Sequence, residues 1–148
     1  MEWTHKNLPV DTIPDDVFGF VYELTYKSGL KYIGKKQVHS YNEKTALKSG
    51  KPRKGHIKFL NRIKKSKRVA MELVATESKW RNYESSSKDI DPEDKVIAKT
   101  ILFYSHKKQY LSYLEDRELF KVEACINDNY YNKNIAGRYF SNLLDDKE

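Results

Sequence analysis

Residues 18–34 read FGFVYELTYKSGLKYIG, and this stretch decides the expected fold. Two runs rich in aromatic and β-branched residues flank the three-residue connection KSG, a pattern typical of a β-hairpin. If Gly29 adopts the left-handed conformation after a type I turn, Tyr26 faces Leu30 and Tyr22 faces Gly34 across the hairpin.

That register predicts a candidate phosphate pocket on one face of the hairpin. Tyr22, Tyr32, Gly34 and Lys36 project from the same face, with the two tyrosines as diagonal neighbours about 7–8 Å apart. Because Gly34 has no side chain, we expect open space over the Tyr22 phenol. Lys36 is expected to lower the pKa of the neighbouring phenols. Ordinary packing of tyrosines in a sheet is the alternative that the hairpin alone leaves open.

A strand and a helix are expected after the middle of the chain. The acidic sequence DPED at 91–94 is a helix-start signal, but VIAKTILFY at 96–104 favours a strand. We expect Ser105 to cap a helix over about 106–125, and residues 127–144 to form a loop and a short final helix. The predicted buried side of the long helix consists of Leu111, Leu114, Leu119 and Val122.

Glu115 falls within the apolar row of this helix. An unpaired carboxylate is costly there, and a divalent cation such as Mg²⁺ would neutralise it. A glutamate at the edge of the row, or one paired with a lysine of the basic segment, is the alternative. Glu118 is expected to be a solvated partner of Arg117 or Lys121.

Positive charge is concentrated in residues 31–68. This stretch contains 14 Lys and Arg against one acid, Glu43, and therefore carries +13 while the rest of the chain carries −6. Such a cluster favours a polyanionic partner, and interleaved aromatic residues such as Tyr32, Tyr41 and Phe59 can stack on bases. A solvated basic loop is the alternative. The candidate nucleic-acid contacts are Lys35, Arg53, Lys54, Arg62, Lys64, Lys65, Lys67, Arg68 and Arg81.

Local patterns divide the basic segment into a loop and a helix. Residues 41–55 predict a loop, residues 56–68 (HIKFLNRIKKSKR) predict a short basic helix, and residues 69–76 predict a strand. The expected fold class is α+β, with a small antiparallel three-stranded sheet flanked by helices and a basic insertion over about 37–68. Residues 1–17 are expected to form an N-terminal arm, and residues 18–148 a single domain.

Composition narrows the remaining classes. Cys125 is the single cysteine, and no run approaches a membrane span, so we expect an intracellular, cytoplasmic protein with no membrane partner. Zinc-type Cys/His spacing and Gly-rich phosphate loops are absent from the sequence. The oligomeric state is not indicated.

Several motifs, in order, resemble the GIY-YIG nucleases, and in particular phage-encoded members. FVY at 20–22 and YIG at 32–34 resemble the paired signature, the second being an intact match. YIGKK continues at 32–36, ESKWRNY follows at 77–83, SYLE at 112–115 and YYN at 130–132. The resemblance covers residues 19 to about 135 and implies a small sheet flanked by helices.

The resemblance also implies a reaction and its residues. Tyr22 and Tyr32 correspond to the active-site tyrosines, Glu115 to the metal-binding glutamate and Asn132 to the asparagine that follows it. The implied activity is endonucleolytic hydrolysis of double-stranded DNA with Mg²⁺, or Mn²⁺ in its place. Tyr22 would take a proton from the attacking water, and Lys36 would neutralise phosphate charge.

One departure from the family pattern leaves alternatives open. Family members usually carry an arginine within about a dozen residues of YIG, whereas residues 35–50 contain none; Arg62 and Arg81 are candidate substitutes. The alternatives are a catalytically weak or inactive nucleic-acid-binding protein on the same fold, and a basic RNA-binding domain.

Overall fold

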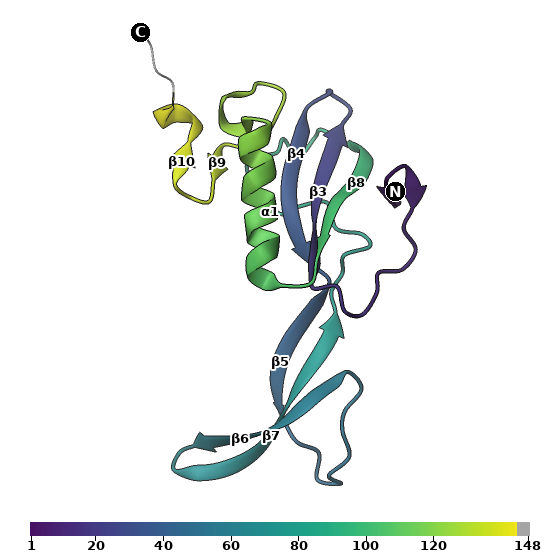
Figure 1. The fold of residues 1–148 in the computed structure, drawn as a ribbon, viewed down its shortest axis with the longest axis vertical. Helices are drawn as coiled ribbons and strands as arrows, with labels where there is room; N and C mark the ends of the chain where they lie inside the picture. The colour runs from purple at the N-terminus through teal and green to yellow at the C-terminus, as the bar shows by residue number, and fades with distance from the viewer. Residues whose placement is uncertain (145–148) are drawn as a thin grey trace. The chain divides into compact units, whose positions relative to one another are not determined.

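The computed structural model describes residues 1–144, which divide into two compact units (Figure 1). Of the described residues, one unit comprises 1–38 and 79–144, and the other comprises 39–78. Each unit is built on its own sheet, and the basic segment lies largely in the second.

The first unit contains a five-stranded sheet in the order β2-β1-β8-β3-β4. Its strands are β1 (Trp3–His5), β2 (Leu8–Pro9), β3 (Gly19–Tyr26), β4 (Lys31–Gln37) and β8 (Val96–Ser105). The predicted sheet had three strands, two fewer than the structure has. The N-terminal residues add β1, which is parallel to β8, and β2, which is antiparallel to β1. Trp3 anchors this addition: it is 2% exposed, and its indole Nε1 donates to the Trp80 carbonyl at 2.8 Å.

The β3–β4 hairpin has the predicted register. Tyr22 lies opposite Gly34, and the Tyr26 amide donates to the Leu30 carbonyl at 2.9 Å. Gly29 has φ of 91°, the left-handed conformation that the three-residue connection requires. The strand predicted over 96–104 is also confirmed, as β8.

One α-helix, α1 (Lys108–Lys121), is present in the described residues, so the expectation of several flanking helices was wrong. It is shorter than predicted. Lys107 is the N-cap residue, and Ser105 instead accepts a hydrogen bond from the Lys107 amide at 3.2 Å. At the other end, the left-handed Glu123 (φ 53°) begins a separate 3₁₀ turn, η1 (Ala124–Ile126). The tail contains β9 (Asn134–Ile135), β10 (Tyr139–Phe140) and the 3₁₀ helix η2 (Ser141–Leu143).

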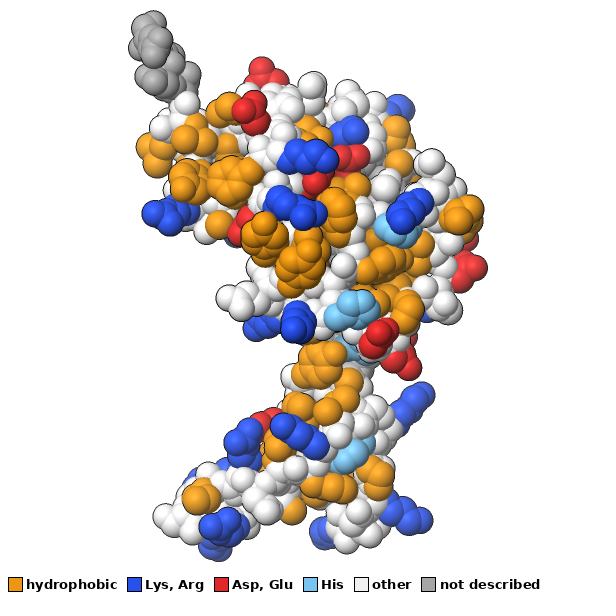
Figure 2. Space-filling view, in the orientation of Figure 1, with side chains coloured by type: hydrophobic (Ala, Val, Ile, Leu, Met, Phe, Trp, Pro, Cys, Tyr) orange, Lys and Arg blue, Asp and Glu red, His pale blue; other side chains and the backbone are white. Residues whose placement is uncertain are grey.

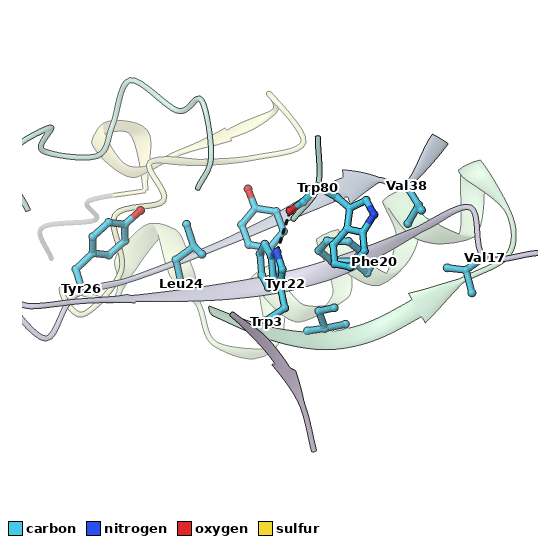
Figure 3. Packing of buried hydrophobic residues seen from close by; sticks show 9 residues of the cluster. Trp3, Val17, Phe20, Tyr22, Leu24, Tyr26, Val38 and Trp80 are labelled. Atoms are coloured by element: carbon cyan, nitrogen blue, oxygen red, sulfur yellow. Dashed lines mark hydrogen bonds between the residues drawn. The ribbon is translucent and has the colours of Figure 1, made fainter. Parts of the chain in front are cut away.

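Two apolar clusters cover the two faces of this sheet. On one face, Figure 3 shows Tyr22 packed among Trp3, Phe20 and Trp80. On the other face, Val21 and Ile33 pack with Leu111, Leu114 and Leu119 of α1. Because successive strand residues point to opposite faces, Tyr22 and α1 lie on opposite sides of the sheet. None of the helices in residues 1–144 is both long and apolar enough to cross a membrane.

The second unit is a three-stranded antiparallel sheet in the order β5-β7-β6. Its strands are β5 (His39–Thr45), β6 (His56–Lys64) and β7 (Lys67–Glu77). The helix predicted over 56–68 was wrong, because Lys65 and Ser66 both adopt positive φ (49° and 64°) and form a two-residue hairpin turn. The loop predicted over 41–55 is a strand up to Thr45, whereas the strand predicted over 69–76 lies within β7.

A buried carboxylate organises the interior of this sheet. Glu72 is fully buried, with Arg53 Nε at 2.9 Å and His56 Nδ1 at 2.8 Å. Burial opposes ionisation of Glu72, but the hydrogen bonds from His56 and the Arg53 backbone outweigh it, so the pKa is lowered. Arg53 therefore has a structural partner.

Candidate active site

A pocket of about 180 Å³ lies in the first unit where β4 faces α1 and the chain before β9. It brings together three of the five residues predicted to be catalytic: Tyr32, Glu115 and Asn132. The other lining residues are Ile33, Ser87, Asp89, Leu119, Lys133, Asn134 and Ala136. Residues separated by a hundred positions in the sequence thus meet at one edge of the sheet.

Glu115 is half-buried in this pocket, with 19% of its side chain exposed. The Lys35 ammonium lies 4.0 Å from its carboxylate and donates to Ser112 Oγ at 2.8 Å. Burial raises the pKa of Glu115, Lys35 lowers it and Asp116 raises it, for a net increase. Glu115 is therefore a desolvated carboxylate whose lysine neighbour, at the limit of ion-pair distance, compensates it only in part.

Asn132 fixes the edge of β4. Its side-chain Nδ2 donates to the Ile33 carbonyl at 2.8 Å, and its Oδ1 accepts from the Ile33 amide at 3.0 Å. The residue is 6% exposed. Both amide functions are thus engaged with the strand between Tyr32 and Gly34, and Asn132 is a positioning residue in this arrangement.

Tyr22 lies beside the pocket and does not line it. It is 1% exposed, and its ring centroid lies 6.4 Å from that of Tyr32. A Cβ atom at Gly34 would stand 2.6 Å from Tyr22 Cζ. The expected open space over Tyr22 is therefore occupied by its own phenol, and the glycine is needed to make room for that ring.

Ser85 connects the two signature tyrosines. Its hydroxyl interacts with both Tyr22 and Tyr32 and lowers the pKa of each, and Ser87, which lines the pocket, does the same for Tyr32. Burial raises the pKa of Tyr22 far above its ordinary value, with Ser85 opposing the rise, and burial likewise raises the pKa of Tyr32. The expectation that Lys36 lowers these pKa values was wrong, because desolvation dominates. Both phenols are neutral at physiological pH.

Lys36 is positioned by an aromatic residue that the sequence-based site did not include. Its ammonium lies 4.5 Å from the centre of the Tyr83 ring, and Tyr83 packs edge-on against Tyr22 at 5.9 Å. Tyr83 is the last residue of the ESKWRNY motif, and Ser85 lies two residues beyond it. That motif was a signal for them, but only the fold shows that it reaches the tyrosines.

The face of the hairpin that carries Tyr22, Tyr32 and Lys36 does not point at Glu115, because α1 packs on the other face. The lysine that faces Glu115 is Lys35. Only Tyr32, at the sheet edge, lines a pocket with Glu115. Successive side chains of β4 point to opposite faces of the sheet, so Lys35 faces α1 whereas Tyr32 and Lys36 lie on the face of Tyr22.

The two candidate arginines lie outside the pocket, and Glu118 is not a solvated residue. Arg62 pairs with Glu43 in the second unit, and Arg81 lies 4.5 Å over the Trp80 ring and donates to the Asp11 carbonyl. Neither lines the pocket. Glu118 is only 9% exposed, so its expected role as a solvated partner was wrong.

Most of the predicted nucleic-acid contacts are exposed basic side chains. Figure 2 shows many Lys and Arg side chains, and few acidic ones, over residues 39–78. Arg53 is engaged with Glu72, and Lys35 with Ser112 and Glu115. Those exposed within the second unit are Lys54, Arg62, Lys64, Lys65, Lys67 and Arg68.

The pocket offers oxygen ligands for a hard cation. No cluster of three or more His, Cys, Asp or Glu suited to a metal occurs within residues 1–144, so a closed protein cage is not formed there. Glu115 and Asp89 nevertheless line the same pocket. Mg²⁺ commonly uses one or two carboxylates and completes its shell with water and substrate phosphate, so this donor set fits it.

The first unit is an α+β fold whose tyrosine-bearing hairpin lies beside a glutamate-lined pocket. A family model described as "Putative endonuclease segE, GIY-YIG domain" matches residues 3–135, and the chain belongs to this GIY-YIG family. Searches of curated proteins and of solved structures returned no match. An endonuclease domain implies a nucleic-acid partner.

Proposed function

We propose that this chain is an Mg²⁺-dependent endonuclease that hydrolyses phosphodiester bonds of double-stranded DNA. The observation that carries the proposal is the convergence of Tyr32, Glu115 and Asn132 on one pocket, with the Tyr22 ring 6.4 Å from that of Tyr32. These residues come from distant parts of the chain, and simple β-packing of tyrosines does not require them to meet.

Glu115 would hold the cation, with Asp89 in the same pocket as a second oxygen donor. A bound Mg²⁺, or Mn²⁺ in its place, supplies Lewis-acid polarisation of a phosphate oxygen. Glu115 suits this role because burial makes its charge unfavourable and Lys35, 4.0 Å away, does not fully compensate it. Asn132 keeps the neighbouring strand, and with it Tyr32, in place.

The tyrosines act as neutral hydrogen-bonding groups in this proposal. Because burial raises the pKa of Tyr22 and of Tyr32, neither is a phenolate that could accept a proton from water. Tyr32 would donate to a phosphate oxygen or hold the attacking water, while Tyr22 orients Tyr32 through Ser85. Lys36, held over Tyr83, supplies a cation on the tyrosine side of the hairpin.

Origin and location form a further part of the proposal. The order of the YIGKK, ESKWRNY, SYLE and YYN motifs resembles phage-encoded members, which supports a phage-encoded enzyme acting in the cytoplasm of an infected bacterium. The exposed cations of the second unit support DNA as the partner.

A second candidate is a DNA-binding protein of this family without catalysis. The observation that favours it is the lining of the pocket: no arginine lies there to clamp the phosphate, and Tyr22 is 1% exposed. The two candidates differ in cleavage and agree in binding, so a cleavage assay separates them.

The test is nicking of supercoiled plasmid by the purified chain with Mg²⁺ and with EDTA. We expect Mg²⁺-dependent nicking that Tyr32→Phe reduces at least tenfold. Tyr113→Phe is the matched control, since Tyr113 is 57% exposed on α1 and does not line the pocket. Absence of nicking by the parental chain, with plasmid binding retained, would favour the second candidate.

A further inference from the structure

The tip of the second unit is a two-stranded ribbon. β5 pairs with β7 from Met71 to Glu77, whereas β6 pairs with β7 from Lys67 to Val74. Residues 67–69 therefore pair with β6 alone, whereas the Ala70 carbonyl also accepts a hydrogen bond from the Ala46 amide at 2.9 Å. The Lys65–Ser66 turn joins these residues to residues 61–64. We refer to residues 61–70 as the ribbon tip.

The ribbon tip is strongly basic and has no acidic residue of its own. Lys64, Lys65, Lys67 and Arg68 are all exposed, and none of them forms a salt bridge within the described residues 1–144. No Asp or Glu occurs between Glu43 and Glu72. Lys64 lies directly opposite Lys67, a like-charge pair that destabilises an isolated hairpin. A polyanion would relieve this repulsion.

Positive charge is present on both faces of the ribbon tip. Opposed residues of a ladder share a face, so the Lys64–Lys67 pair projects from one side and Arg68, opposite Ile63, projects from the other. A ribbon with cations on both sides can contact two walls of a groove at once. A flat binding face would carry them on one side only.

Groove dimensions select the type of duplex. The major groove of B-form DNA is about 12 Å wide and admits a two-stranded β-ribbon, whereas the minor groove is only about 6 Å wide. The major groove of duplex RNA is deep and too narrow for side chains to read. Shape and charge together therefore favour the DNA major groove.

We propose that the ribbon tip inserts into the major groove of duplex DNA, with Lys64, Lys65, Lys67 and Arg68 contacting phosphates and base edges. The inference rests on the proposed function in taking DNA as the substrate, and it assigns the element that engages it. Ile63, 70% exposed at the tip, provides an apolar contact for base edges such as thymine methyl groups.

The first test measures binding to a 30-base-pair DNA duplex at several salt concentrations, with Glu115→Gln as the parent and EDTA present. The tip variant carries Lys64→Thr, Lys65→Asn, Lys67→Thr and Arg68→Thr. Threonine favours strands, and asparagine tolerates the positive φ of the turn, so the hairpin is retained. The matched control, with the same loss of charge at exposed positions, is Lys44→Thr, Lys48→Thr, Lys51→Thr and Lys58→Thr.

We expect the tip variant to lower the slope of log K against log salt by about 3 to 4, since each phosphate contact contributes about 0.9, and the control to lower it by less than about 1. Equal slopes for the two variants would overturn the proposal. Thermal unfolding verifies that both variants are folded. A double variant, Lys65→Asn with Arg68→Thr, should show about half the effect, so the test remains decisive if the fourfold variant does not fold.

The second test identifies the groove by dimethyl sulfate footprinting, which methylates guanine N7 in the major groove and adenine N3 in the minor groove. We expect protection at guanine N7, lost in the tip variant, and at least tenfold weaker binding to duplex RNA of the same sequence. Protection confined to adenine N3, or equal binding to RNA, would refute major-groove insertion.

Failure of the inference and failure of the proposed function are distinguishable. If binding depends on the ribbon tip but the wild-type chain does not cleave DNA, major-groove insertion stands and the proposed endonuclease activity is refuted. If the wild-type chain cleaves DNA but binding does not depend on the ribbon tip, the endonuclease activity stands and major-groove insertion is refuted.

Discussion

The side chain of Asn132 forms two hydrogen bonds with the backbone of Ile33, at 2.8 and 3.0 Å. Ile33 lies between Tyr32 and Gly34 on β4, the strand at the edge of the five-stranded sheet. A side-chain amide thus pairs with this edge as a neighbouring strand would. It joins the chain before β9 to the strand that carries one of the two signature tyrosines.

Asn132→Asp should destabilise the protein. Aspartate cannot donate to the Ile33 carbonyl, and an unpaired buried polar group costs about 1–3 kcal/mol. Urea unfolding at pH 7 measures the loss. Asn129→Asp, at an exposed position whose backbone carbonyl is the group that bonds Lys31, is the control and should change little. Equal stability of Asn132→Asp and the wild-type chain would show that the hydrogen bonds between Asn132 and Ile33 do not stabilise the fold.

Gly34→Ala should disturb the tyrosine pair directly. The added methyl group would stand 2.6 Å from Tyr22 Cζ, so the ring must shift, at about 1–3 kcal/mol of stability, and nicking should fall. Gly29→Ala is the comparison: its φ of 91° strains the backbone, but no atom lies within 4 Å of the added carbon. We expect Gly29→Ala to lose stability and keep activity while folded. Full activity in Gly34→Ala would show that the close approach is unimportant.

Ser85→Ala should separate Tyr22 from Tyr32. Losing the interaction of the Ser85 hydroxyl with the two phenols, at a typical hydrogen-bond value of about 0.5–1.5 kcal/mol, predicts a roughly 2- to 10-fold slower nicking rate. Ser86→Ala, at the neighbouring exposed position, should leave the rate unchanged. If both variants nick alike, Ser85 does not link the tyrosines functionally.

Local patterns predicted the signature hairpin well. KSG with Gly29 allows one register that satisfies both the turn and the alternation, and Tyr22 faces Gly34 as that register requires. The strand at β8 and the apolar side of α1 were also predicted from local patterns. The spacing of apolar residues along the sequence indicates which side of an element is buried.

Contacts between distant segments were beyond local reasoning. The ladder of β6 and β7 depends on left-handed Lys65 and Ser66, residues without the asparagine or glycine that would announce such a turn. The β1 strand depends on Trp3 reaching Trp80, and the exclusion of Tyr22 from the Glu115 pocket depends on which face α1 covers. Motif order indicated the site residues, but their roles followed only from packing.

Stability should report cation binding at Glu115 independently of activity. Burial raises its folded-state pKa above the ordinary 4.5, so the ionised carboxylate disfavours the folded state at pH 7. In EDTA, Glu115→Gln should therefore be the more stable protein at pH 7. The difference should shrink as the pH falls below the raised folded-state value and disappear below 4.5.

Mg²⁺ should reverse that order. At a concentration tenfold above its dissociation constant, a bound ion stabilises the wild-type chain by about 1.4 kcal/mol and leaves Glu115→Gln unaffected. Thermal unfolding across a Mg²⁺ titration provides the measurement. An equal shift in both proteins would place the cation elsewhere.

The most direct measurement is plasmid nicking by Glu115→Gln beside the wild-type chain, in the same Mg²⁺ buffer and with contaminating nucleases excluded. Gln keeps the size of the side chain and removes the charge that holds a hard cation, so cleavage should be abolished while DNA binding persists. Tyr22→Phe should also lose activity but retain the Mg²⁺-dependent rise in stability. Nicking by Glu115→Gln at the parental rate would contradict the assignment of this pocket as the catalytic centre.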